Sequence, residues 1–145
     1  MATEYISGSL DEIKYVFMIV KYKDKFVLSW HKKSQKWDNV GGHVEKDEKP
    51  LAAAKRELYE ETGAVDFDIV PVCDFKAYRD DGVFHNNGRT YFVNVRKFTE
   101  LPDGSEMGKI GFFDEIPENF RYVGEHEKYT ANYKRFEKYA LAYFE

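Results

Sequence analysis

The segment from Pro50 to Thr62 constrains the fold and the chemistry of this chain more than any other. Proline suits the first position of a helix, and Gly63 suits the left-handed residue just past the end, so a helix is predicted here. Glu57, Glu60 and Glu61 stand at positions i, i+3 and i+4, so their side chains share one face. Like charges at this spacing oppose helix formation by a few tenths of a kcal/mol per pair, so a compensating positive group is expected.

Two interpretations of this acidic face are open from the helix spacing alone. Arg56 can pair with Glu60 across one turn, but one arginine cannot neutralise three carboxylates. Grouped carboxylate oxygens are the ligands that Mg²⁺ or Mn²⁺ requires. The alternative is a solvated face with surface ion pairs, which the spacing by itself favours because glutamate is common on exposed helices.

A longer pattern around the helix decides between them. Five residues separate Gly42 from Glu48, seven separate Glu48 from Arg56, and the run Arg-Glu-Leu-Tyr-Glu-Glu-Thr-Gly-Ala begins at Arg56. This pattern resembles the Nudix box, and a chance match has a probability of about 10⁻⁹ per start position. Ala64 departs from the box, where a bulkier aliphatic residue is usual, and we expect this to affect packing rather than chemistry.

The resemblance implies a fold, a reaction and a cofactor. The fold would be of the α/β class, an α/β/α sandwich with a mixed β-sheet. The reaction would be hydrolysis of a nucleoside diphosphate linked to another group, by attack of metal-activated water on phosphorus. The cofactor would be Mg²⁺ or Mn²⁺. By the same resemblance the metal ligands would be Gly41, through its carbonyl, Glu57, Glu60 and Glu61.

The remaining box residues would support this centre. Arg56 would orient a metal-binding glutamate by a charge-assisted hydrogen bond, so Arg56, Glu57 and Glu60 are expected to take part in catalysis. Glu48 would brace the loop, and Gly42 would permit close approach of the backbone.

Many relatives use one further carboxylate outside the box, as a metal ligand or a general base. Glu106, before a short late strand, resembles that position in MutT-like members and is the predicted catalytic residue. Glu115 and Glu118 are the alternatives, although their segment is more typical of a chain turn.

Substrate contacts are predicted in the loop before the helix. Trp37 either stacks on a base or anchors the loop in the fold. Asn39 or Asp38 could read a purine edge, and His43 is expected beside a phosphate rather than as the base. The segment with Phe84 and Arg89 could close over a ligand.

The compact chain resembles MutT-like enzymes, so the predicted reaction converts a nucleoside triphosphate, including an oxidised one, to the monophosphate and pyrophosphate. ADP-ribose or nucleotide-sugar cleavage is the alternative within the family. A nucleotide sensor without turnover is the alternative from another class, but such members usually lose box glutamates, and this box keeps them. Capped RNA is less favoured because no basic tract is visible along the chain.

Elsewhere the pattern predicts strands over residues 13–21, 26–31, 67–78, 89–98 and 109–113. Loops are predicted over residues 34–47 and 79–88, and a second helix over residues 125–144. That helix carries an apolar, largely aromatic stripe at helical spacing, formed by Tyr129, Tyr133, Phe136, Tyr139, Ala140 and Tyr143. Strands on both sides of one internal helix, followed by a closing helix, indicate a mixed α/β sandwich.

Length and composition limit the other possibilities. The 145 residues fit one domain, residues 1–145, and a net charge of −4 argues against affinity based on nucleic-acid phosphates. One cysteine, Cys73, permits no internal disulfide and is expected at an ordinary strand position. No secretory leader or membrane-spanning run is visible, so we expect a soluble cytoplasmic monomer or homodimer that binds a small nucleotide.

Overall fold

Eight strands and two helices make up the structure, a computed structural model that describes residues 2–144 and the side chains of residues 3–142. The strands are β1 (Ala2–Ile6), β2 (Ile13–Tyr22), β3 (Lys25–His31), β4 (Lys36–Asp38), β5 (Val40–His43), β6 (Ala64–Tyr78), β7 (Phe84–Phe98) and β8 (Met107–Phe113). The helices are α1 (Pro50–Thr62) and α2 (His126–Phe144).

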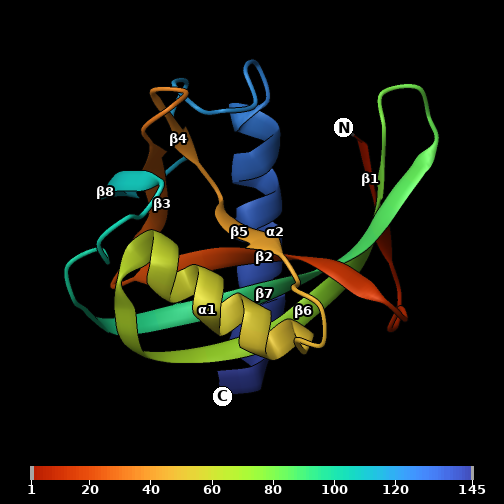
Figure 1. The fold of residues 1–145 in the computed structure, drawn as a ribbon, viewed down its shortest axis with the longest axis horizontal. Helices are drawn as coiled ribbons and strands as arrows, with labels where there is room; N and C mark the ends of the chain where they lie inside the picture. The colour runs from red at the N-terminus through yellow and green to blue at the C-terminus, as the bar shows by residue number, and fades with distance from the viewer. Residues whose placement is uncertain (1, 145) are drawn as a thin grey trace.

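All eight strands belong to one mixed sheet. Its order is β1-β6-β7-β2-β3-β4, with β5 paired to β2 and β8 paired to β3. The β2 and β7 strands run parallel, whereas the other strand pairs are antiparallel. The two helices cover opposite faces, with α1 in front of the sheet and α2 crossing behind it (Figure 1). The predicted α/β/α sandwich with a mixed sheet is confirmed.

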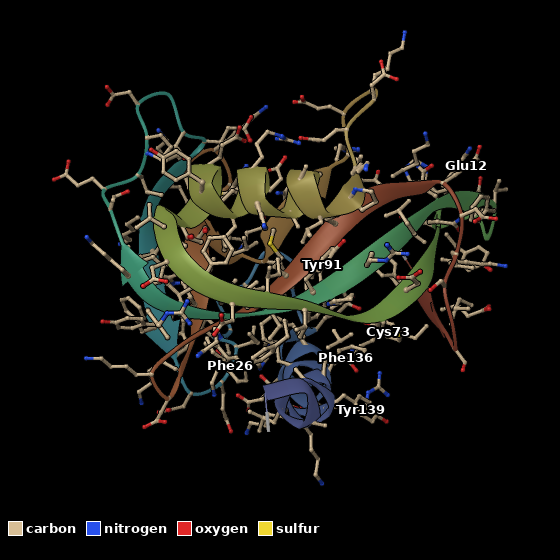
Figure 2. The ribbon with its side chains drawn as sticks, turned by 90° about the horizontal axis from the view of Figure 1, so that it is seen from below. Glu12, Phe26, Cys73, Tyr91, Phe136 and Tyr139 are labelled. Atoms are coloured by element: carbon tan, nitrogen blue, oxygen red, sulfur yellow. The ribbon has the colours of Figure 1, made fainter. Side chains whose placement is uncertain are left out.

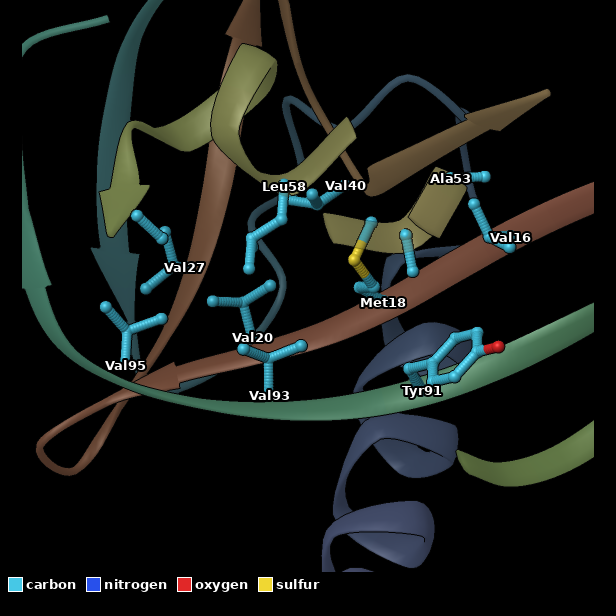
Figure 3. Close-up of a cluster of buried hydrophobic side chains, with 12 residues drawn as sticks. Val16, Met18, Val20, Val27, Val40, Ala53, Leu58, Tyr91, Val93 and Val95 are labelled. Carbon is cyan, nitrogen blue, oxygen red and sulfur yellow. The ribbon is translucent and has the colours of Figure 1, made fainter. Parts of the chain in front are cut away.

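The core on the α1 side is built from small and aliphatic side chains. Alternate residues of β2, namely Val16, Met18 and Val20, point toward α1, where Val16 lies beside Ala53 and Val20 lies below Leu58 (Figure 3). Period-two alternation on a strand places these residues on one face, which explains the apolar run in the sequence. The small alanines on the inner face of α1 let the helix lie close to the sheet.

The core on the α2 side is aromatic. Tyr133, Phe136 and Ala140 of the predicted stripe are buried against the sheet, and Tyr129 packs at the margin of this cluster. Tyr139 was predicted wrongly: it is 60% exposed, whereas Phe136 lies between α2 and the sheet (Figure 2). Tyr143 lies outside the residues whose side chains the structure describes.

Three differences from the sequence prediction concern strand bounds. The predicted loop over residues 34–47 contains β4 and β5, because Gly41 lets β5 approach β2 closely. A Cβ at Gly41 would lie 2.4 Å from the Val16 carbonyl oxygen. The predicted loop over residues 79–88 is a hairpin turn, closed by a 2.8 Å hydrogen bond from the Arg79 N–H to the Val83 carbonyl. Its second arm extends β7 back to Phe84, whereas β6 ends at Tyr78 as predicted, and β1, which pairs with β6, was not predicted.

Cys73 lies half-buried in β6, the ordinary strand position that was expected (Figure 2). In the described part of the chain, neither helix is both long and apolar enough to cross a membrane.

Candidate active site

Helix α1 begins and ends where the sequence predicts. Lys49 precedes Pro50 and makes no side-chain cap, as expected of a poor capping residue. Gly63 adopts φ 77° and donates its N–H to the Tyr59 carbonyl, while its own carbonyl accepts a 2.7 Å hydrogen bond from Thr99. Leu51 is 42% exposed, whereas Ala53, Ala54 and Leu58 are buried on the inner face of the helix. This docking leaves the three glutamates at the rim of the sheet.

Arg56 ties the loop before the helix to the helix itself. Its guanidinium forms a two-pronged contact with Glu48, at 2.8 Å and 2.9 Å, and donates a 3.0 Å hydrogen bond to the His43 carbonyl. The Arg56 hydrogen bonds, aided by the N–H of Glu45, lower the pKa of Glu48 to about 2. Glu48 therefore stays ionised and holds the arginine in one orientation.

The same guanidinium also reaches the glutamates of the helix. Its Nη1 lies 2.9 Å from Glu57 Oε1 and 3.4 Å from Glu60 Oε2. Gly42 lies directly against Glu57, since a Cβ there would be 2.4 Å from the carboxylate oxygen. Burial raises the pKa of Glu57 even though Arg56 opposes the shift. Glycine at this position thus creates the space that the Glu57 carboxylate occupies.

Glu61 carries the most perturbed carboxyl group of the cluster. Its Oε1 accepts a 2.8 Å hydrogen bond from the N–H of Gly41. Burial, with smaller contributions from the negative charges of Glu57, Asp38 and Glu106, raises the pKa of Glu61 to about 9. The shift comes mainly from burial, and the neighbouring carboxylates add to it.

A cleft of about 630 Å³ lies between α1 and the segment from Pro102 to Met107. Its walls carry the glutamates of α1 and, facing them, Glu106. The Ser105 hydroxyl donates a 2.8 Å hydrogen bond to the Glu60 carbonyl, which fixes the segment against the helix. Glu115 and Glu118 are not among the lining residues, and Glu115 pairs with Lys134 at 3.6 Å. Of the three carboxylates considered, Glu106 is the one that the fold brings to the cluster.

The predicted substrate residues lie in three different environments. Trp37 is packed edge-on against Trp30 and Phe113, with ring centres 5.1 Å and 4.9 Å away, so it is held within the fold. His43 is exposed and packs on Tyr15. Asn39 is half-buried, and its Oδ1 accepts a hydrogen bond from the Tyr133 hydroxyl.

The segment expected to close over a ligand is instead part of the sheet. Arg89 lies in β7 and forms a two-pronged contact with Asp74, at 2.7 Å and 3.0 Å. Phe84 begins β7 and is exposed beside Tyr78. Neither residue lines the cleft at α1.

Residues 13–135 match the model of the NUDIX domain family, a span that includes α1 and every carboxylate of the cleft. The chain belongs to the Nudix family. YtkD of Bacillus subtilis (strain 168), named as a candidate 8-oxo-dGTP diphosphatase, is 31% identical over 109 residues, which cover 75% of this chain and 67% of YtkD.

Solved Nudix structures share the fold at lower identity. The B. subtilis pyrophosphohydrolase BsRppH, solved as a mutant, superposes with a TM-score of 0.77 and 23% identity, covering 94% of this chain and 89% of that chain. The NUDIX domain of Shewanella oneidensis NrtR, solved with ADP ribose, superposes with a TM-score of 0.62 and 16% identity, covering 88% of this chain and 89% of that chain. The predicted family and fold class, and the prediction that the chain is a Nudix hydrolase, are confirmed.

Nudix hydrolases generally use a divalent metal, and the chemistry of this cleft fits one. The donors are hard carboxylate oxygens, which Mg²⁺ and Mn²⁺ prefer, and they carry more negative charge than Arg56 balances. Within the described residues no three such side chains yet converge on one point. Arg56 engages Glu57 and Glu60, whereas Glu61 engages the Gly41 N–H. Cation binding therefore requires the glutamates to exchange these contacts for the metal.

Sequence reasoning on this Nudix hydrolase missed Arg121. Its Nη1 lies 2.7 Å from Oδ2 of Asp38, which is 7% exposed, and its N–H donates to the Trp37 carbonyl. Asp38 lies close enough to Glu61 to raise the pKa of that carboxyl. No local pattern signals this pair, because 83 residues separate its members.

Proposed function

We propose that this Nudix hydrolase cleaves a nucleoside triphosphate, with oxidised purine nucleotides among its candidate substrates, to the monophosphate and pyrophosphate. The observation that carries the proposal is the cluster of Glu57, Glu60 and Glu61, which faces Glu106 across one cleft with too little positive charge to balance it. A divalent cation with a polyphosphate chain matches that charge pattern. The name of YtkD supports a triphosphate substrate.

Each residue of the cleft has a proposed role. Glu57, Glu60, Glu61 and the Gly41 carbonyl would hold Mg²⁺ or Mn²⁺. When bound, the cation neutralises phosphate oxygens and makes water more acidic. Arg56 orients Glu57 through their 2.9 Å hydrogen bond, and Glu48 holds Arg56 in place.

Glu106 would accept a proton from the attacking water. As that water oxygen bonds to phosphorus, the bond from phosphorus to the pyrophosphate oxygen breaks, and the electron pair leaves with pyrophosphate. No covalent enzyme intermediate is needed. The proposed setting is the cytoplasm, where such nucleotides occur and where a lone Cys73 stays reduced.

The test is a panel of nucleotides incubated with Mg²⁺, with the products identified by chromatography. We expect nucleoside monophosphate and pyrophosphate from triphosphates, including 8-oxo-dGTP, and no turnover when the metal is chelated. Cleavage of ADP-ribose to AMP and ribose 5-phosphate, with triphosphates left intact, would replace the proposal with the alternative that the NrtR complex favours. Binding without any turnover would indicate a nucleotide sensor.

A further inference from the structure

Tyr133 of α2 is an enclosed tyrosine whose hydroxyl has one partner. The side chain is 1% exposed, and the rings of Phe17 and Phe26 pack on it edge-on, with centres 5.9 Å and 5.3 Å away. Burial raises the pKa of the phenol well above its usual value, so the hydroxyl keeps its proton. Among the described residues its hydrogen-bond acceptor is Oδ1 of Asn39, 94 residues away in the sequence.

This single contact fixes the orientation of the Asn39 amide. If the amide were turned over, the hydroxyl proton would face the Nδ2 group and lose its acceptor inside an apolar cluster. An unsatisfied buried donor costs about 1–3 kcal/mol, so the observed orientation is strongly preferred. The Asn39 Nδ2 group therefore faces away from α2 with its hydrogens free to donate.

Asn39 is not among the residues that line the cleft, but it lies near the residues that surround Glu61. It stands two residues before Gly41, whose N–H holds Glu61, and directly after Asp38, which lies within electrostatic reach of that carboxyl group. An amide donor at this distance along the chain is placed to meet the nucleoside of a nucleotide whose phosphates lie against α1.

Aromatic side chains occur on the same side of the sheet. Tyr122 is 39% exposed and is stacked on Tyr129, with ring centres 5.4 Å apart and an 8° angle between the planes. Tyr15 lies close enough to influence Tyr122 electrostatically, and His43 packs on Tyr15 at 4.4 Å. Tyr122 also lies within electrostatic reach of Asp38, which precedes Asn39. Partly exposed rings on the same side of the sheet as a fixed amide donor are features that suit a purine.

We propose that Tyr133 is a specificity-determining positioning residue, which holds Asn39 so that its amide donates to the nucleobase and favours 6-oxopurine nucleotides over adenine nucleotides. Guanine offers an oxygen acceptor at position 6, whereas adenine offers an amino donor, which would face the amide donor and leave both unpaired. This inference rests on the proposed function, because it concerns the nucleotide bound at that cleft.

The experiment compares GTP with ATP in two ways. One measure is the ratio of kcat/KM values with Mg²⁺, and the other is the ratio of Kd values for GMP and AMP, which needs no turnover. We expect the wild-type chain to favour guanine by roughly tenfold or more in both ratios. One polar contact left unpaired in the adenine complex would produce a preference of this size. Tyr133→Phe should reduce both ratios several-fold, mainly through KM, with kcat for GTP little changed.

Two further variants make the test specific. Asn39→Asp replaces the amide donor by an acceptor that Tyr133 can still hydrogen-bond, so the preference should shift toward adenine. Tyr139→Phe removes an exposed hydroxyl from the same helix and should leave both ratios unchanged. Thermal unfolding of each variant checks that the fold is intact.

The possible outcomes separate the two proposals. Triphosphate turnover without a guanine preference, or a preference that Tyr133→Phe leaves intact, would overturn the role of Tyr133 and leave the proposed reaction standing. Absence of turnover would overturn the reaction, while the GMP and AMP ratios would still decide the role of Tyr133.

Discussion

The polar contacts on the two faces of the sheet differ in how far apart their partners lie in the sequence. On the α1 side, the carboxylates of the box come from one short stretch of sequence, and the hydrogen bond from the Gly41 N–H to Glu61 joins residues 20 apart. On the α2 side, the polar contacts are long-range, and the bond from Tyr133 to Asn39 joins residues 94 apart. The acidic cluster of α1 is therefore encoded locally, whereas the polar contacts on the α2 side depend on the tertiary fold.

The largest expected effect is on the α1 side. Glu61→Gln should lower kcat by about 10³-fold with Mg²⁺, because a ligand of the proposed metal is lost. Glutamine keeps an oxygen that can accept the Gly41 N–H, so the fold should persist, and thermal unfolding checks this. A variant with near-normal kcat would remove Glu61 from the catalytic centre.

The next largest effect on kcat is expected at Glu106, the carboxylate from outside the box. Glu106→Gln is expected to lower kcat by about 10²-fold, the usual contribution of a general base, with a smaller loss of metal affinity. Glu115→Gln provides the matched control, since Glu115 pairs with Lys134 away from the cleft and its loss should not change kcat. Equal effects of the two substitutions in a steady-state assay would contradict the assignment.

Substitutions at the two adjacent glycines should affect stability and activity differently. Gly41→Ala places a Cβ against the rigid Val16 carbonyl and is expected to lower the free energy of unfolding by about 3 kcal/mol. Gly42→Ala meets only the mobile Glu57 carboxylate, so it should lower kcat by about tenfold with little loss of stability. Urea unfolding and kinetics on both variants check the contrast, and a reversed pattern would refute it.

The pair of Arg121 and Asp38 tests whether contacts between residues far apart in the sequence stabilise the fold. Arg121→Gln removes the ion partner of the buried Asp38 carboxylate, which keeps the hydrogen bond from the Asn39 N–H. It should lower the free energy of unfolding by about 1–2 kcal/mol, a modest value because Arg121 itself is half-exposed. Adding Asp38→Asn should recover most of the loss. Strictly additive losses in urea unfolding would show that the two side chains are not coupled.

The smallest effect concerns acid stability. Burial alone would raise the pKa of Asp74, but hydrogen bonds from Arg89 and the Leu10 N–H lower it below the usual value. A lowered pKa contributes stability above the unfolded-state pKa of 3.8, and this is lost as pH falls through the folded-state value. Asp74→Asn should therefore flatten the fall in unfolding free energy below about pH 4, as measured by urea unfolding across this pH range.

Local patterns were enough to predict α1 and the box because each signal lies within the segment itself. Pro50 and Gly63 mark the helix ends through backbone preferences alone, and the glutamate spacing follows from helix geometry. The strands at Gly41 and Phe84 could not be predicted in the same way. Their pairing depends on distant partners, which override the low strand propensity of glycine and the polarity of the hairpin arms.

The same limit applies to the site. Glu106 could be proposed from a family position, but its place opposite α1 is set by the segment that Ser105 fixes to the Glu60 carbonyl. Arg121 carried no signal at all, since a lone arginine near the end of a loop has no periodicity to identify it.

Binding of Mn²⁺ measured by electron paramagnetic resonance, with wild-type chain and Glu61→Gln compared at one pH, tests the central claim most directly. We expect a saturable site in the wild-type chain that the substitution weakens at least tenfold, because one of few protein ligands is removed. Equal Mn²⁺ affinity in both chains, or no saturable binding in either, would contradict the claim that these carboxylates form a metal centre.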